Sequence, residues 1–485
     1  MPKSRTASAA RKQLIVKAAT CTSTALVVLL GITAGAAADF TPEGAKTQAT
    51  ALMDPTELPR SGGDSGASDG TFSAGQPQPT TAQSSADDAD TEADVAGDDA
   101  DAEGAGSAPA DSPGDPLDVT VEKSSDDIRV GTVRAGMTSS TEEELLEDLG
   151  TGVFPPARSL AEAAQLNRPD VLLVTGITSD GDEEIAETLR SKYFEVGQNG
   201  QEGLDYPYVY AGPSNSGNES GADLDGDGVV GGPGDSIGYG EHPGQHGMIL
   251  FSSFPIEEKG VRTFQEFLWE DLPDSAAGSS EYSDLERSVM RLTSAAFWDV
   301  PLTVDAGEDS ERTVNVVASS LARPQDPADV DADRGDDERR MIADYLAGEA
   351  WYLTDDDGDP APGTGSEFVY MGEPATQYDL PGSANEDLAE LLDSQAVQDP
   401  EPEAVTEEPL SSRSVGSGGS QSRATRAVDD GMDVRSAFIL PGASMDIGDS
   451  GVFWPAEGEY GADLVQPGSD QAISDRLVWL DIPRS

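Results

Sequence analysis

Three aspartates with regular spacing are the clearest candidates for metal chemistry in this sequence. Asp223, Asp225 and Asp227 occupy alternate positions in the segment GADLDGDGVVGG, and Gly228 follows them. This spacing is typical of the first half of a calcium loop, in which carboxylate oxygens converge as the backbone turns. Position twelve of such a loop is Gly234 here, where a complete EF-hand has a bidentate Glu. The sequence therefore predicts a Ca²⁺ site at the three aspartates, with a solvated acidic loop as the alternative.

The two histidines of the chain, His242 and His246, lie in the short segment EHPGQH. The proline and glycine between them predict a loop, so the imidazoles do not share one helical face and zinc binding is disfavoured. A histidine beside a functional cleft is the alternative interpretation. A second acidic cluster, at positions 355–357 and 359, predicts a surface loop.

Strands and helices that alternate along the chain must position these candidates. Nine short apolar segments predict strands, at 128–133, 171–177, 208–212, 247–253, 297–304, 312–321, 368–372, 436–441 and 477–482. Helical spacing, with proline or acidic residues at the start, predicts helices at 155–167, 185–193, 336–350 and 385–393. Many strands that interleave with helices indicate an α/β architecture with two large sheets.

Composition divides the chain into regions. Residues 1–38 predict a signal peptide, because a basic stretch precedes the apolar run 25–32 and the small residues 34–38. That run is far shorter than the roughly 20 residues of a membrane span, so we expect a secreted, extracellular chain without a span. Residues 39–125 predict a disordered acidic tether. Residues 126–485 are expected to form the folded domain, with a disordered insertion at 398–430.

The chain is strongly acidic, with 92 Asp and Glu against 29 Lys and Arg and a net charge of −63 at pH 7. Such a charge repels phosphate backbones, so direct binding to nucleic acid is disfavoured. The only cysteine, Cys21, lies inside the predicted signal peptide. Disulfides and thiolate chemistry are therefore excluded from the mature chain.

Several long, aromatic-rich segments carry a resemblance to a known family. They are ARSLAEAAQLNRPDVLLV (157–174), YPYVYAGPSNSG (206–217), DLDGDGVVGGPGD (223–235), PGQHGMILFSSFPI (243–256), VRTFQEFLWEDLP (261–273), FWDVP (297–301), GVFWP (451–455) and RLVWLDI (476–482). In their order and in their amino-acid sequences these segments resemble the endonuclease/exonuclease/phosphatase superfamily, specifically its large secreted bacterial branch. The resemblance implies a four-layer α/β sandwich of two mixed β-sheets flanked by helices, here with long acidic loops.

Relatives in this superfamily cleave phosphate esters with a divalent metal such as Mg²⁺ or Mn²⁺. That chemistry needs a metal-binding carboxylate, a histidine with an acidic partner, and groups that polarise the phosphoryl oxygen. Arg134 stands where the family has Asn after its first strand. Thr175 and Gly176 stand where the family has an Asn–Glu pair whose Glu binds the metal. Glycine has no side chain that could take over this ligation.

The later family positions are changed as well. Ser320 stands at the place of a catalytic His, and Glu373 and Ala375 replace an Asp-x-Asn pair. Asp475 is followed by Arg476, where the family has His. Loss of one member of a catalytic unit already removes most of its rate enhancement. The resemblance therefore implies that no catalytic residue set remains, and it favours a non-catalytic protein over an enzyme.

Three functions are compatible with these observations. The first is a secreted, catalytically inactive phosphoesterase-fold protein that binds an unidentified ligand or cell-surface partner. The second is an active phosphodiesterase, nuclease or phosphatase that depends on Mg²⁺ or Mn²⁺. The third is an acidic surface module that binds Ca²⁺. The changed family positions favour the first of these hypotheses.

Overall fold

The computed structural model describes residues 120–181, 183–279, 282–305, 311–321, 332–374, 391–392, 394–404, 423–427, 433–466 and 473–484. All of them belong to one compact unit, Ala102–Ser485. The predicted signal peptide and residues 39–119 of the predicted tether lie outside the described residues. The predicted helix at 385–393 also lies outside them, apart from residues 391 and 392.

Six strands form the first sheet, in the order β12-β13-β1-β2-β4-β3. They are β1 (Asp127–Met137), β2 (Val171–Ile177), β3 (Tyr208–Tyr210), β4 (Gly247–Ser252), β12 (Ser450–Val452) and β13 (Val478–Pro483). The β1–β2 pair is parallel, and the other pairs in this sheet are antiparallel. Strand β2 is buried along its whole length, as its continuous apolar sequence predicts.

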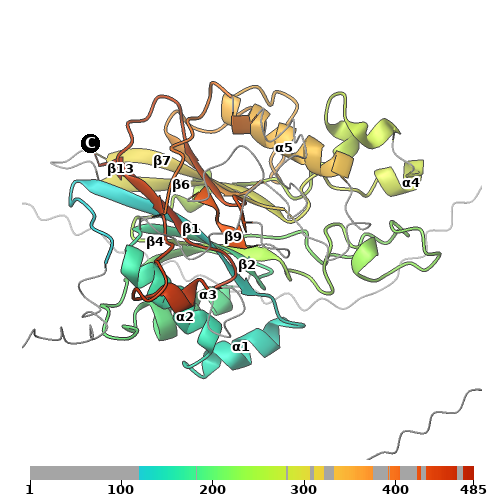
Figure 1. The fold of residues 1–485 in the computed structure, drawn as a ribbon. Coiled ribbons are helices and arrows are strands. Elements are labelled where there is room, and N and C mark those ends of the chain that lie inside the picture. The colour runs from blue at the N-terminus through green and yellow to red at the C-terminus, as the bar shows by residue number, and fades with distance from the viewer. Residues whose placement is uncertain are drawn as a thin grey trace, which may run out of the picture. The chain divides into compact units, whose positions relative to one another are not determined.

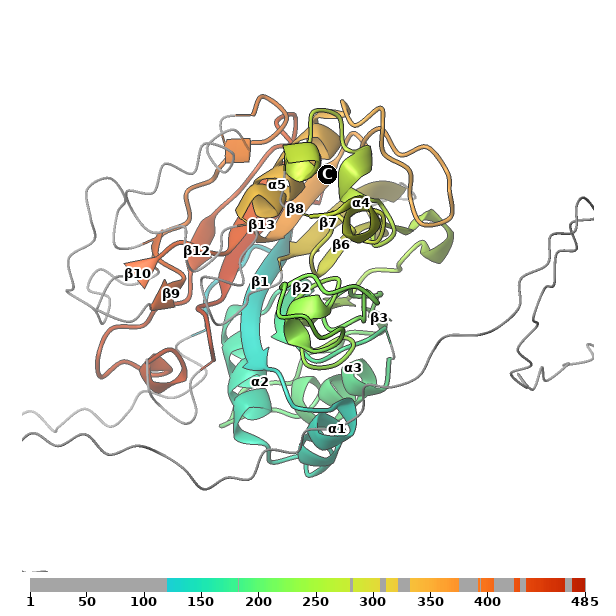
Figure 2. The ribbon, with the colours of Figure 1, turned by 90° about the vertical axis from the view of Figure 1, so that its right-hand side faces the viewer.

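Five strands form the second sheet, in the order β11-β8-β7-β6-β5. They are β5 (Arg262–Thr263), β6 (Ala296–Asp305), β7 (Glu311–Ser320), β8 (Phe368–Glu373) and β11 (Phe438–Pro441). The β7–β8 pair is parallel and the others are antiparallel, so this sheet is also mixed. A separate antiparallel pair joins β9 (Arg426–Ala427) to β10 (Asp433–Val434). Figure 2 shows this pair on the β12 side of the six-stranded sheet.

Local sequence explains where the helices begin and end. The helices are α1 (Glu142–Gly150), α2 (Pro155–Asn167), α3 (Glu183–Leu189), α4 (Asp284–Arg287) and α5 (Ala332–Ala347), and a π-helical turn, Arg190–Phe194, continues α3. The Thr141 hydroxyl accepts a hydrogen bond from the Glu144 amide at 3.1 Å and caps α1. Helix α2 starts with proline, and its C-terminal cap is Arg168, whose φ of 52° is left-handed.

Two hydrophobic cores define four layers (Figure 1). One core contains buried side chains from both sheets and from α1, α2 and α3. The second core lies between the five-stranded sheet and α5. The order of layers is helices, six-stranded sheet, five-stranded sheet, helix. The predicted four-layer α/β sandwich of two mixed sheets is therefore confirmed.

The predicted insertion at 398–430 contains two short described segments. Residues 398–404 and 423–427 make backbone hydrogen bonds to the sandwich, among them Gln398 N to Pro441 O at 3.0 Å and Arg476 N to Thr425 O at 2.7 Å. These two segments are thus part of the folded domain, whereas residues 405–422 and 428–430 lie outside the described residues. Within the described chain, no helix combines the length and the apolar character that crossing a membrane requires.

Candidate functional site

The fold brings the changed family positions together. They lie at or near strand ends from both sheets: Arg134 in β1, Thr175 and Gly176 in β2, Ser320 in β7, Glu373 in β8, and Asp475 just before β13. The parallel register places Ser320 directly opposite Glu373. The positions that the resemblance identified as changed therefore lie close together in the structure.

Glu373 is the buried centre of this cluster, with 1% of its surface exposed. Its Oε1 accepts a 2.6 Å hydrogen bond from the Thr175 hydroxyl. Its Oε2 accepts longer contacts from two guanidinium groups, 3.4 Å from Arg134 Nη1 and 3.5 Å from Arg426 Nη2. Burial raises the pKa of the Glu373 carboxyl to about 7; Arg134 opposes this rise and the charge of Asp475 adds to it.

Asp475 is the second buried carboxylate, and Arg426 binds it through two nitrogens. Arg426 Nε donates to Oδ1 at 2.9 Å and Nη2 donates to Oδ2 at 2.6 Å. The Ser436 hydroxyl adds a 3.0 Å bond to Oδ2. Such a bidentate pair is a strong, directional form of ion pair. Sequence reasoning missed Arg426, because it lies inside the predicted insertion and far along the chain from both carboxylates.

Arg134 occupies the space that Gly176 leaves open. A Cβ built on Gly176 would lie 2.8 Å from both Cγ and Cζ of Arg134. Gly176 also has a φ of +61°, which residues with a side chain rarely adopt. A glutamate at this position would therefore collide with Arg134, so the two changes from the family pattern depend on each other.

Ser320 and His246 complete the surroundings of the cluster. Ser320 is 1% exposed, and its hydroxyl has no hydrogen-bond partner among the described residues. The pKa of His246 is lowered to about 4, chiefly because burial disfavours the charged ring and further because Arg134 and His242 are nearby. A neutral His246 in this position is consistent with the positive charge of Arg134.

The side chain of His242 contacts backbone carbonyl groups. Its Nε2 lies 2.8 Å from the Ser139 carbonyl oxygen, and its Nδ1 lies 2.9 Å from the Pro243 carbonyl oxygen. Both ring nitrogens of His242 thus lie within hydrogen-bond distance of backbone carbonyl oxygens. This geometry supports the prediction that the two histidines do not form a zinc site.

The residues present do not fit the divalent metal that the family implies. The carboxylate position in β2 is Gly176, and the two remaining carboxylates, Glu373 and Asp475, already accept from guanidinium groups. Two arginines, Arg134 and Arg426, contact these two carboxylates within the cluster. A metal ion here would face two fixed positive charges, which oppose its binding.

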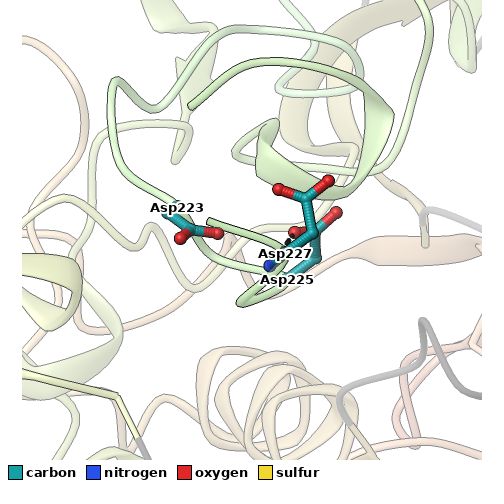
Figure 3. Close-up of side chains that lie close together, drawn as sticks. All are labelled: Asp223, Asp225 and Asp227. Atoms are coloured by element: carbon teal, nitrogen blue, oxygen red, sulfur yellow. Dashed lines mark hydrogen bonds between the residues drawn. The ribbon is translucent and has the colours of Figure 1, made fainter. Parts of the chain in front are cut away.

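The three predicted calcium ligands do come together, as Figure 3 shows. Asp223, Asp225 and Asp227 each offer a carboxylate oxygen, and these oxygens lie within 4.8 Å of one another. This is the only such group of three or more metal-ligating side chains in the part of the chain that the structure describes. Asp235 does not join it, because its carboxylate accepts from the backbone amides of Leu224, Asp225 and Gly231. Asp235 therefore organises the loop rather than serving as a fourth ligand.

The second acidic cluster has a structural role. The Asp356 carboxylate accepts from the Thr263 hydroxyl at 2.6 Å and from the amides of Gln265 and Glu266 at 2.9 and 2.8 Å. These bonds tie the loop to the edge of β5. The interpretation of this cluster as a plain loop is consistent with the geometry.

Comparison with known protein families matches part of the chain. Residues 148–357 match the model of the Endonuclease/Exonuclease/phosphatase family. This match supports the resemblance to the endonuclease/exonuclease/phosphatase superfamily that the sequence predicted. No curated protein matches the sequence.

Several solved structures are similar to the chain at low sequence identity. An endonuclease/exonuclease/phosphatase from Beutenbergia cavernae is 14% identical, with 74% of this chain and 71% of that chain covered and a TM-score of 0.39. One from Bacteroides vulgatus is 9% identical, with 73% and 98% covered and a TM-score of 0.38. A mannosyl-6-phosphatase of Bacteroides thetaiotaomicron is 9% identical, with 73% and 98% covered and a TM-score of 0.36.

Proposed function

We propose that this chain is a non-catalytic member of the superfamily that acts by binding a ligand or partner. One observation carries the proposal: Arg134 and Arg426 contact the two remaining carboxylates of the site, Glu373 and Asp475. Phosphoryl transfer requires charge neutralisation on the non-bridging oxygens and a group that handles a proton. Here both carboxylates are committed to internal ion pairs, and Ser320 stands at the position of the family's histidine.

Phosphoester hydrolysis assays test this proposal. The purified chain is expected to release no more product than buffer from a nitrophenyl phosphate monoester, a bis-nitrophenyl diester or DNA, in Mg²⁺, Mn²⁺ or Ca²⁺. The matched control is Glu373→Ala, together with a mock purification from cells without the gene. Metal-dependent cleavage by the wild type that disappears in Glu373→Ala would overturn the proposal. It would show that the chain is an active phosphoesterase.

We further propose that the chain is exported, on the basis of the order of charges and apolar residues in 1–38. N-terminal sequencing of the product from an expressing bacterial host tests this. A mature product in the culture medium that begins near residue 39 supports export. A product that retains Met1 would contradict the signal-peptide prediction.

We also propose that Asp223, Asp225 and Asp227 bind Ca²⁺ weakly, in the roughly millimolar range of extracellular modules. The convergence of their oxygens within 4.8 Å supports this proposal. Titration calorimetry with CaCl₂ on the wild type and on Asp225→Ala is the test. The wild type is expected to release heat that the variant does not, whereas equal heats mean that the loop is only solvated.

A further inference from the structure

The only Asn-Gly pair of the sequence, Asn199 and Gly200, forms a tight turn that contacts α2. The two residues have φ of 46° and 92°, so both are left-handed, as in a type I′ turn. The Gln201 amide donates to the Gln198 carbonyl oxygen at 2.8 Å and closes the turn. Asn199 and Gly200 are both exposed, so water has access to them.

An asparagine that precedes glycine is prone to deamidation, because glycine has no side chain to shield its amide nitrogen. Within the described part of the chain the Gly200 amide donates no hydrogen bond, so a base has access to its proton. The deprotonated nitrogen attacks Cγ of Asn199, the Cγ–Nδ2 bond breaks, and ammonia leaves a five-membered imide. Water then opens the imide at one of its two carbonyls and gives aspartate or isoaspartate. The net reaction consumes one water, releases one ammonia and involves no oxidant or reductant.

The side chain of Asn199 is held by Glu162, which lies on α2. Asn199 Nδ2 donates to Glu162 Oε2 at 2.7 Å. Glu162 is only 6% exposed, and its Oε1 accepts a 2.6 Å hydrogen bond from the Tyr460 hydroxyl. Hydrogen bonds to a charged group are stronger than those between neutral groups. Because imide closure requires the left-handed turn to open and Nδ2 to leave, the bond to Glu162 opposes the reaction.

We propose that Asn199 is a deamidation site and that its hydrogen bond to Glu162 sets the rate. The amide reacts slowly while it is bound and at the rate of an unrestrained Asn-Gly pair once it is released. The aspartate product places a second carboxylate beside Glu162, where like charges repel. The isoaspartate product adds a methylene to the backbone of the turn. Either product detaches the turn from α2, and the reaction does not depend on whether the chain is catalytic.

Peptide mapping by mass spectrometry of the folded full chain, incubated at mildly alkaline pH, measures the conversion of Asn199. We expect Glu162→Ala to convert at least about tenfold faster than the wild type, because it loses a hydrogen bond to a charged group. Both aspartate and isoaspartate are expected at position 199. Equal rates in the two chains, or no conversion in either, would refute the proposal. Aspartate without isoaspartate would refute the imide route.

Two further variants separate this bond from a general loosening of the fold. Tyr460→Phe removes the other hydrogen bond to the same carboxylate and leaves Asn199 bound, so it should convert at the wild-type rate. Acceleration as large as that of Glu162→Ala would refute the role of the Glu162 bond. Glu162→Gln keeps the side-chain shape with a neutral acceptor and covers the case in which Glu162→Ala does not fold, as judged by circular dichroism. It should convert faster than the wild type, and an unchanged rate would overturn the proposal.

Discussion

The dependence between Gly176 and Arg134 can be measured with one substitution, Gly176→Ala. The new Cβ would lie 2.8 Å from Arg134 Cγ, which is close to the backbone and cannot swing aside as a side-chain tip can. Arg134 must then leave its position, and Glu373 loses its 3.4 Å contact with Nη1. Alanine must also adopt the left-handed φ of +61° at this position.

The expected decrease in the free energy of unfolding has two parts. A residue with a Cβ in the left-handed region costs about 1–2 kcal/mol. Displacing a guanidinium from a buried carboxylate costs about 1–2 kcal/mol more, at the low end of the range for charged hydrogen bonds because the contact is long and Thr175 and Arg426 remain. We therefore expect Gly176→Ala to lower the free energy of unfolding by about 3 kcal/mol. In an Arg134→Ala background only the backbone part, about 1–2 kcal/mol, should remain.

Urea unfolding followed by tryptophan fluorescence gives these free energies for the four chains of the double-mutant cycle. Gly152→Ala is the matched control, because Gly152 has a φ of +69° but no atom within 4 Å of a built Cβ. Its cost should be about 1–2 kcal/mol in both backgrounds. The dependence between Gly176 and Arg134 is refuted if Gly176→Ala lowers the free energy of unfolding no more than Gly152→Ala does. It is also refuted if the decrease is the same with and without Arg134.

Three further predictions concern single side chains. Glu373 has a raised folded-state pKa of about 7, so its stabilising contribution is present below about pH 4.5 and is lost as the pH rises through 7. The wild type should lose up to about 3 kcal/mol relative to Glu373→Gln between pH 5 and 8, and parallel urea-unfolding profiles would contradict this. His246 has a lowered pKa of about 4, so its contribution is present above about pH 6.5 and is lost toward pH 4. Thermal melts should show His246→Gln losing less stability than the wild type over that range. Asp356→Ala removes three hydrogen bonds at the β5 edge and should cost about 2–4 kcal/mol by urea unfolding, whereas a cost below 0.5 kcal/mol would refute its structural role.

The long elements of the fold could be predicted from local sequence. The bounds predicted for β2 and α2 coincide with the observed ones, Val171–Ile177 and Pro155–Asn167, because each is a continuous pattern with clear ends. Strands β5, β9, β10 and β12 were missed, since each has two or three residues and exists through pairing with distant segments. Helix α1 was missed although Thr141 and the acids after it form a recognisable N-terminal cap.

The site could be predicted only in part. The resemblance identified Arg134, Gly176, Glu373 and Asp475 as changed positions, and the structure places them together. It gave no reason for the changes, because the contact of Arg134 with Gly176 joins two strands and has no local signal. Arg426 could not be found, since its partners Glu373 and Asp475 are 53 and 49 residues away and its own segment is short and polar. Composition alone predicted disorder there.

The contacts of the two carboxylates indicate what the altered site now does in the molecule. Glu373 ends β8 of the five-stranded sheet, and its strongest bond comes from Thr175 on β2 of the six-stranded sheet. Asp475 leads into β13 of the six-stranded sheet and accepts from Ser436, which precedes β11 of the five-stranded sheet. Each carboxylate therefore links the two halves of the sandwich, and Arg426 joins one link to the other. In some proteins a buried ionic network contributes more to the choice of one arrangement than to stability, and we infer that the network here fixes the alignment of the strand ends. Such a role requires every side chain to keep its internal partner, and that requirement conflicts with releasing a carboxylate to a substrate-bound metal.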